Sequence, residues 1–312
     1  MPVGSDLARR IELQLNSEFA PMKNIRGPIS NSLASDGGGF GSRHIEAATR
    51  IRRAIHARES IDDLLDDWRE NQDMVLIGKM AIALVIQKAE ADTHLGLMSA
   101  DENSYLDCIS TLRETWLGQV IRHLQATKNR RQLAELLKEV GFIIFNYDRC
   151  VEQILVGELA CNTTMDLAQA RSYVRSMHIV HPYGCLGTAH GPAELRRFGS
   201  ESDLLVELSK GIRTYTEEMH DANDLARMRN ILSKAQTTIF LGFGYHPKNV
   251  SLLMDHGLNI AGHIHGACLD PSPARLTAAQ REFFPAGPSE NLQNINCRDF
   301  IWNWRGPLFG AT

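Results

Sequence analysis

The sequence predicts an α/β protein with a Rossmann-like, doubly wound parallel sheet and an all-helical insertion. After Val140, short apolar runs alternate with amphipathic helical segments; the runs are GFIIFN, MHIVHPYG, TTIFLGFG and LNIAGHIHG. Short, wholly apolar strands separated by helices are typical of a buried parallel sheet. Residues 47–138, in contrast, contain no proline and few glycines, which favours helices throughout that region.

Apolar periodicity predicts where the individual elements lie. Strands are expected at 141–146, 178–181, 237–242 and 258–264. Helices are expected at 6–15, 74–97, 105–124, 131–140, 148–159, 164–177, 222–235 and 247–256. Ser60 suits the N-cap of one more helix, whose aspartates Asp62, Asp63, Asp66 and Asp67 are expected to form a solvated face. Residues 21–43 are rich in glycine and serine and are expected to form a loop.

These elements predict one domain over residues 1–312. The Rossmann-like core would be formed by residues 1–44 and 140–312. Residues 45–139 would be the helical insertion, almost entirely without strands.

The composition excludes several classes of protein. Lys and Arg number 33 and Asp and Glu number 37, so the formal charge is −4 and gives no reason to expect direct nucleic-acid or anionic-membrane binding. No apolar run approaches the ~20 residues that span a bilayer. The amino terminus, MPVGSDLARRIELQL, is charged and lacks the apolar core of a signal peptide. We therefore expect a cytoplasmic protein.

The cysteines give no support for a metal site. The chain has six, and none belongs to a C-x-x-C pair: Cys108, Cys150, Cys161, Cys185, Cys268 and Cys297. A tetrahedral zinc site of the finger or ribbon kind is therefore not expected. A disulfide framework is equally unexpected in a chain of this size without a secretory signal.

Polar residues and glycines gather where the predicted strands end. The four strand ends lie at 146–148, 181–184, 242–246 and 263–266. In an open parallel sheet, ligands bind beyond the carboxyl ends of the strands. The sequence therefore predicts a small-molecule site at that edge. His263 and His265 are expected to serve packing or nucleotide contact rather than metal binding.

In order along the chain, FNYDRCVEQIL, HPYGCLG, TTIFLGFGYHPKNVSLL and NCRDFIWNWRGPL resemble the bacterial sirtuin-like NAD-binding and NAD-hydrolysing domains of antiphage defence. The resemblance extends to the insertion, with SIDDLLDDW and IGKMAIALVIQKAE. It is to the divergent branch that lacks the four-cysteine zinc module of the deacetylases. It implies NAD as the substrate, cleavage to nicotinamide and ADP-ribose, and no metal. It also implies a separate sensor or partner protein and a homo-oligomer.

The resemblance implies three catalytic residues. Asn146 would contact the nicotinamide ribose and orient water, Asp148 would hold ribose hydroxyls, and His181 would be the general base. A cap on the following helix is the alternative for Asp148, and His178 is the alternative histidine. Neither Asn146 nor His181 is expected to lie in the core.

The resemblance also implies a set of nucleotide-binding residues: Gly184, Gly242, Gly244, Tyr245, His246 and Asn249. The glycines would let the nucleotide approach the backbone, and Tyr245 or Asn249 would reach the ribose. An ordinary turn between strand and helix is the alternative for residues 242–249, which lack the third glycine of a dinucleotide fingerprint.

The family begins with a strand and a Gly-Ala-Gly-Ala-Ser type loop that receives the pyrophosphate at a helix N-terminus. This chain begins with the segment that follows, so we expect it to bind NAD weakly as given. That departure favours an alternative, a non-catalytic NAD-binding, ADP-ribose-binding or partner-docking module. NAD-dependent protein deacylation is a weaker alternative, because the zinc module and the peptide cleft are missing.

Overall fold

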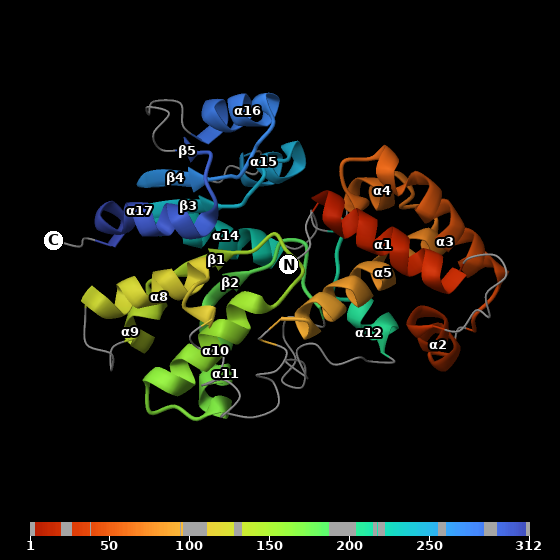
Figure 1. The fold of residues 1–312 in the computed structure, drawn as a ribbon, viewed down its shortest axis with the longest axis horizontal. Coiled ribbons are helices and arrows are strands. Elements are labelled where there is room, and N and C mark those ends of the chain that lie inside the picture. Colours follow the sequence, from red (N-terminus) through yellow and green to blue (C-terminus); the bar gives the residue numbers. More distant parts are fainter. Residues whose placement is uncertain are drawn as a thin grey trace. The chain divides into compact units, whose positions relative to one another are not determined.

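The computed structural model describes residues 4–19, 27–37, 39–93, 95, 111–127, 133–186, 204–214, 217, 222–254, 260–283 and 292–309 (Figure 1). Contacts within the chain divide it into two compact units. Unit 1 comprises Met1–Tyr105, Ile144–Gln153 and His181–Asp221. Unit 2 comprises Leu106–Ile143, Ile154–Val180 and Ala222–Thr312. The predicted division into a core and an insertion stays a prediction.

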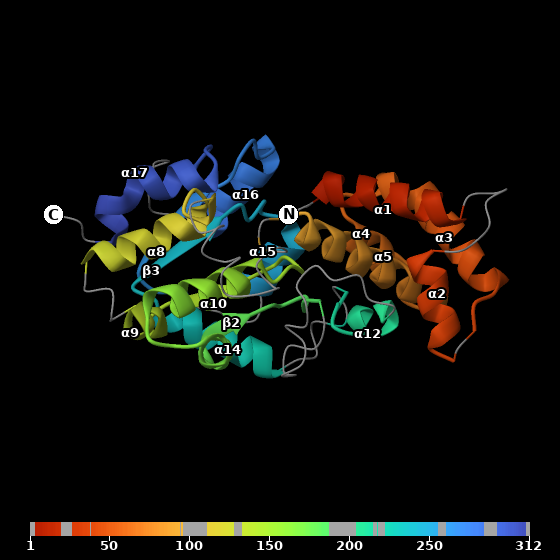
Figure 2. The same ribbon diagram turned by 60° about the horizontal axis from the view of Figure 1, so that its bottom comes forward.

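Unit 1 is helical in its described part, and α5 forms its centre. Its helices are α1 (Gly4–Phe19), α2 (Pro28–Ser35), α3 (Ser42–Ala54), the 3-10 turn η1 (Ile55–Ala57), α4 (Ile61–Asp67), α5 (Gln72–Ala91) and α12 (Leu205–Ser209). Helix α5 packs against α1, α2, α3, α4 and α12 (Figures 1 and 2). It is buried along nearly its whole length, as expected for a helix that is apolar all round.

Local capping explains where α4 and α5 begin. The Ser60 hydroxyl accepts a hydrogen bond from the Asp63 N–H at 3.1 Å, which confirms the helix start predicted at Ser60. The Asn71 side chain accepts in the same way from Met74 N–H at 3.0 Å. Each cap satisfies one N–H group that has no partner inside its helix.

The expected loop at 21–43 is wrong in part, because Pro28–Ser35 forms α2. The Glu18 carboxylate, from α1, accepts hydrogen bonds from Ser30 N–H at 2.7 Å and Ile29 N–H at 3.4 Å. Ile29 and Leu33 are buried on the same helix. A carboxylate from another helix supplies this N-terminal cap, so local composition could not reveal it.

The described part of unit 2 contains five short parallel strands in two sheets. The first sheet pairs β1 (Gly141–Ile143) with β2 (His178–Val180). The second has the order β3-β4-β5, with β3 (Thr237–Leu241), β4 (His263–Ala267) and β5 (Leu292–Gln293). These strands confirm the α/β character. The doubly wound arrangement stays a prediction.

The fourth predicted strand, 258–264, is misplaced, because β4 begins at His263. Gly262 has a φ of +71° and approaches Gln236 so closely that a Cβ would lie 2.1 Å from the Gln236 carbonyl oxygen. His263 N–H then donates to that carbonyl at 2.9 Å. The strand starts only after this turn, since a left-handed φ does not continue a strand. As a result, His263 and His265 lie inside the strand instead of at its end.

The helix expected over 105–124 is wrong in part, because residues 113–115 form turns and a bend and the helix begins only at Trp116. The helices of unit 2 otherwise lie near the predicted ones where both exist. They are α8 (Trp116–Thr127), α9 (Leu133–Lys138), α10 (Cys150–Asn162), α11 (Leu167–Ser176), α14 (Ala222–Lys234), α15 (Pro247–Met254), α16 (Pro273–Phe283) and α17 (Cys297–Phe309), with the first turn of α10 in unit 1. Helices α8 and α17 pack together (Figure 2). Phe300 and Ile301 of α17 form a buried cluster with Ala267 of β4.

Residues 45–139 were expected to be almost entirely helical. Where the structure describes them, they contain helices and turns and no strand, which confirms the prediction for that part. In the described part of the chain, no helix has the length and apolar character that crossing a membrane requires.

We predict that Glu18→Ala lowers the free energy of unfolding by about 1–2 kcal/mol, because two buried N–H groups of α2 lose their acceptor. Urea denaturation measures the change. Glu12→Ala, which removes a partly exposed carboxylate of the same helix paired with His56, is the control and should change stability little. Equal effects of the two substitutions would show that Glu18 does not stabilise α2.

Candidate functional site

The segments that follow β1 and β2 in the chain meet in unit 1. They are residues 144–153 and 181–186. Leu186 N–H donates to the Tyr147 carbonyl at 3.1 Å, and the rings of Phe145 and Tyr183 meet edge to face with centroids 5.8 Å apart. The parallel pairing of β1 with β2 confirms that the two predicted strands are neighbours.

His181 lies at the centre of this junction. Its Nε2 is 2.7 Å from Oε1 of Glu152, and its Nδ1 is 3.1 Å from the backbone carbonyl oxygen of Asn146. A carbonyl and a carboxylate only accept hydrogen bonds, so both ring nitrogens donate and the ring is an imidazolium cation. The structure therefore places the His181 ring against the backbone of Asn146, 35 residues away in the chain. That the two side chains act on one ribose stays a prediction.

The pKa of His181 is raised above its ordinary value. Burial alone would lower the pKa of this histidine, but the charge and hydrogen bond of Glu152 outweigh burial, with help from the Asn146 carbonyl and Asp148. Burial would likewise raise the pKa of Glu152, and the charge and hydrogen bond of His181 reverse that effect and lower it. The two groups therefore stabilise one another as an ion pair.

This geometry bears on the role expected of His181. The residue is only 8% exposed, so the expectation that it lies outside the core is wrong. Held between two acceptors, the ring also has no lone pair with which to accept a proton. The general-base role therefore requires that one of its two hydrogen bonds open first.

Asn146 and Asp148 lie on either side of a buried tyrosine. Asn146 is exposed, whereas Asp148 is 6% exposed. Oδ1 of Asp148 accepts a hydrogen bond from Cys150 N–H at 3.1 Å, at the start of α10. This contact matches the helix-cap alternative for Asp148. The ribose contact inferred from the resemblance stays a prediction.

A buried ion pair fixes residues 144–153 to α5. The Arg149 guanidinium donates to Oε2 of Glu90 at 2.6 Å and to Oε1 at 3.3 Å, and the Arg149 backbone N–H donates to Oε1 at 3.0 Å. Glu90 has no exposed surface, and the Arg149 side chain is 7% exposed. Burial opposes the charge on Arg149, but the attraction of Glu90 prevails and raises the pKa of the guanidinium.

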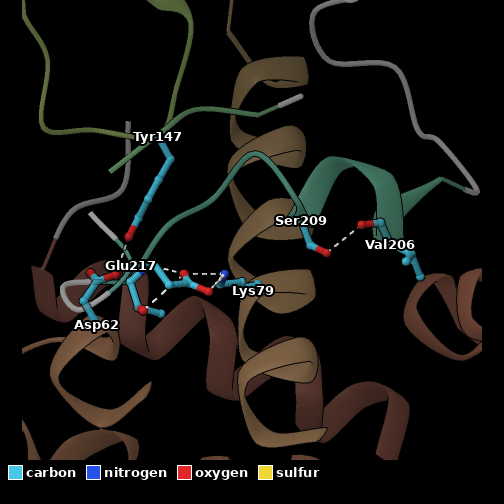
Figure 3. Close-up of polar contacts among 7 residues, drawn as sticks. Asp62, Lys79, Tyr147, Val206, Ser209 and Glu217 are labelled. Atoms are coloured by element: carbon cyan, nitrogen blue, oxygen red, sulfur yellow. Dashed lines mark hydrogen bonds and ion pairs between the residues drawn. The ribbon is translucent and has the colours of Figure 1, made fainter. Parts of the chain in front are cut away.

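Tyr147 ties the same segment to α4. Its hydroxyl donates to the Asp62 carboxylate, and the residue is 5% exposed (Figure 3). The expectation that Asp62 belongs to a solvated face is therefore wrong.

Figure 3 also shows Lys79 of α5, whose ammonium group donates to both Glu217 oxygens at 2.8 and 2.6 Å.

Sequence reasoning missed Glu90 and Glu152. Each is an acidic residue within an apolar helical stretch, LVIQKAEAD and CVEQILVGELA respectively. A carboxylate is rarely buried without a partner. The apolar surroundings of Glu90 and Glu152 in the sequence therefore indicated that each glutamate has a hydrogen-bonding or charged partner. The sequence did not show which residue the partner is.

Gly184 has a structural explanation of its own. Its φ is +72°, and a Cβ at this position would lie 1.9 Å from the Gly211 carbonyl oxygen. It also forms an isolated antiparallel bridge with Ile212. Close backbone packing within unit 1 therefore requires glycine here, and nucleotide contact stays a prediction.

The remaining predicted nucleotide-binding residues belong to unit 2 and follow β3. Gly242, Gly244 and Tyr245 have positive φ values of 62°, 64° and 50°. A Cβ at Gly244 would meet no atom within 4 Å, so this turn leaves space for close approach of a ligand. His246 and Asn249 are half-buried at the start of α15.

Tyr245 is part of an aromatic cluster. It is 1% exposed, and its ring packs against Phe240, Phe243 and Phe283 with centroids 5.2–6.0 Å apart. Burial raises the pKa of its hydroxyl. The ring therefore serves the core of unit 2, which does not favour the ribose contact expected of its side chain.

The described residues include no group of three or more His, Cys, Asp or Glu side chains placed to hold a metal ion. Comparison with protein-family models, curated proteins and solved structures finds no match for this chain. The sirtuin-like assignment therefore stays a prediction from the sequence motifs.

We predict that Arg149→Met lowers the free energy of unfolding by about 3–5 kcal/mol, because it leaves Glu90 buried without its counter-charge. Thermal and urea denaturation measure the loss. Arg50→Met, which breaks an exposed pair with Glu46, is the matched control and should have little effect. A loss no larger than that of the control would mean that the pair does not hold residues 144–153.

The His181–Glu152 pair makes stability depend on pH. Because folding raises the pKa of His181, the stabilisation is complete below the unfolded-state pKa of about 6.5 and is lost as pH rises through the folded-state value. We therefore expect His181→Asn to destabilise the protein more at about pH 6 than at about pH 9. Urea denaturation at both pH values is the measurement, and an equal loss at both would contradict the ion pair.

Proposed function

We propose that this chain hydrolyses NAD to nicotinamide and ADP-ribose, in the manner of the bacterial sirtuin-like domains its motifs resemble. One observation carries the proposal. Asn146 and His181 were assigned to one site from separate motifs, and the His181 ring lies against the Asn146 backbone within unit 1. The exposed position of Asn146 leaves it open to a ligand from solvent.

The reaction needs groups that stabilise positive charge on a ribose. When the bond from C1′ to nicotinamide breaks, nicotinamide keeps the electron pair and the ribose becomes an oxocarbenium ion. The oxygens of Asn146 and Asp148 suit that charge, as carboxylates do in glycosidases. A water molecule then adds to C1′ and gives up one proton.

One feature of unit 1 suits a ribose. The Glu152 oxygen Oε2 is buried and has no hydrogen-bond partner among the described residues, so it offers an acceptor to a hydroxyl or water.

The alternative function is a non-catalytic module that binds NAD or ADP-ribose or docks a partner. The observation that favours it is the engagement of two predicted catalytic groups in structural contacts. His181 is buried with both nitrogens hydrogen-bonded, and Asp148 caps α10. Binding of NAD without release of nicotinamide would support this alternative.

We further propose, from the resemblance alone, that the protein acts as the effector of a defence system. A separate sensor or partner protein would activate it, and it would form a homo-oligomer. A purified protein that is inactive by itself is therefore to be tested again with the products of neighbouring genes.

We predict that Asn146→Ala lowers nicotinamide release from NAD about 10²- to 10⁴-fold, because water and the ribose lose a positioning group. Nicotinamide is quantified by chromatography, using protein expressed from its complete reading frame. The melting temperature should stay within a few degrees of the parent's, since Asn146 is exposed.

The matched control is Asn31→Ala, which makes the same change at an exposed position of α2 and should keep full activity. Parental activity in Asn146→Ala would refute the proposed site. Absence of nicotinamide release from the parent protein, with its partner present, would refute the proposed function.

A further inference from the structure

We propose that Glu152 is a positioning residue that holds Nε2 of His181, so that Nδ1 is the ring nitrogen that acts beside Asn146. This inference rests on the proposed function, and it assigns the orientation and the working atom of the histidine. Nothing in the resemblance assigns a role to Glu152.

The two contacts of the imidazole are unequal. The Nε2 contact to the Glu152 carboxylate is 2.7 Å, whereas the Nδ1 contact to the neutral Asn146 carbonyl is 3.1 Å. A hydrogen bond to an ionised acceptor is shorter and about twice as strong as one between neutral groups. The Nδ1 contact is therefore the one that opens when a substrate or water competes for it.

Glu152 is well placed to hold the ring still. It lies in the first turn of α10, directly after the segment that Arg149 anchors to α5. Its side chain is 16% exposed and that of His181 is 6% exposed. Both partners therefore have little freedom to rotate away, as a group that orients a catalytic histidine requires.

The surrounding charges leave Glu152 as the main partner of His181. Arg149 is bound to Glu90 on α5, and Asp148 is hydrogen-bonded to Cys150 N–H. The buried thiol of Cys185 faces Glu152 and Arg149, and burial raises its pKa to about 12, so it stays uncharged. Asp148 adds a weaker attraction to the imidazolium.

The proton balance follows from this arrangement. His181 first loses its Nδ1 proton to solvent, while Nε2–H stays on Glu152. After the bond from C1′ to nicotinamide has broken, with the electron pair leaving on nicotinamide, the water oxygen bonds to C1′ and one O–H bond of the water breaks. That proton moves to Nδ1, and Glu152 stabilises the imidazolium that forms, as the buried aspartate does in serine proteases. The ring observed here is therefore in the protonated state.

The test replaces Glu152 with Gln, which keeps an oxygen for Nε2–H and removes the charge. We expect kcat for nicotinamide release to fall about 10- to 100-fold with little change in KM. The acidic limb of the pH profile should move to lower pH, because His181 loses the charge that favours its protonated form. Glu152→Asp should restore part of the activity.

Titration of the His181 ring by NMR gives a readout that does not need activity. Its pKa should lie above about 6.5 in the parent and fall in Glu152→Gln. The control is Glu158→Gln, which removes the same charge from α10 at a residue that accepts from Asn162. It should leave the His181 titration and the pH profile unchanged.

The outcomes separate the two proposals. An unchanged His181 titration in Glu152→Gln overturns this inference whatever the activity is. So does an active parent whose kcat and pH profile survive the substitution. A parent that shows no nicotinamide release refutes the proposed function itself. If Glu152→Gln does not fold, the same measurements on Glu152→Ala decide, because alanine also removes the charge, and parental values in that variant overturn the inference.

Discussion

The buried ion pair between Glu90 and Arg149 is the contact on which the candidate site depends. It joins the centre of the helical part of unit 1 to residues 144–153, and it also satisfies the backbone N–H of Arg149. Such a pair is costly to desolvate and stabilises only when its hydrogen bonds are complete. Here three contacts reach one carboxylate. The segment therefore has one favourable position relative to α5. This position also fixes where the residues next to Arg149 lie.

Residues 144–153 include buried side chains that bind the helices and an exposed side chain that does not. Tyr147 and Arg149 are buried and bind Asp62 on α4 and Glu90 on α5. The backbone bends at Asn146 and Tyr147, and Asn146 is exposed although the side chains that follow it are buried. The helices that the sequence marks as an insertion thus help to position the predicted catalytic residues.

The sequence predicted well what depends on local pattern. Strands after Val140, the helix start at Ser60 and the pairing of the strands that precede Asn146 and His181 all follow from periodicity, capping and the geometry of parallel strands. These features need no knowledge of distant residues. The contact of the His181 ring with the Asn146 backbone needed only that two adjacent parallel strands end at one edge.

What the sequence did not predict depends on partners far away in the chain. Helix α2 forms in an expected loop because Glu18 caps it from another helix. Asp62 leaves the expected solvated face because Tyr147 donates to it from 85 residues away. The pairing of Glu152 with His181 becomes evident only in the structure, because the two residues are 29 positions apart. In each case a single polar contact, worth about 1 kcal/mol or more when buried, outweighs the local tendency.

The balance of charge at the site decides what chemistry it can support. Glu90 with Arg149 and Glu152 with His181 form two pairs, each of which cancels its own charge. Among these side chains and Asp148, the Asp148 carboxylate is the one charge left over. Its cap on α10 uses Oδ1, and capping does not remove its negative charge. A buried negative charge interacts more strongly than an exposed one, because little water screens it. Structural and electrostatic roles of Asp148 are therefore compatible, and a reaction that develops positive charge nearby is the kind that this site favours.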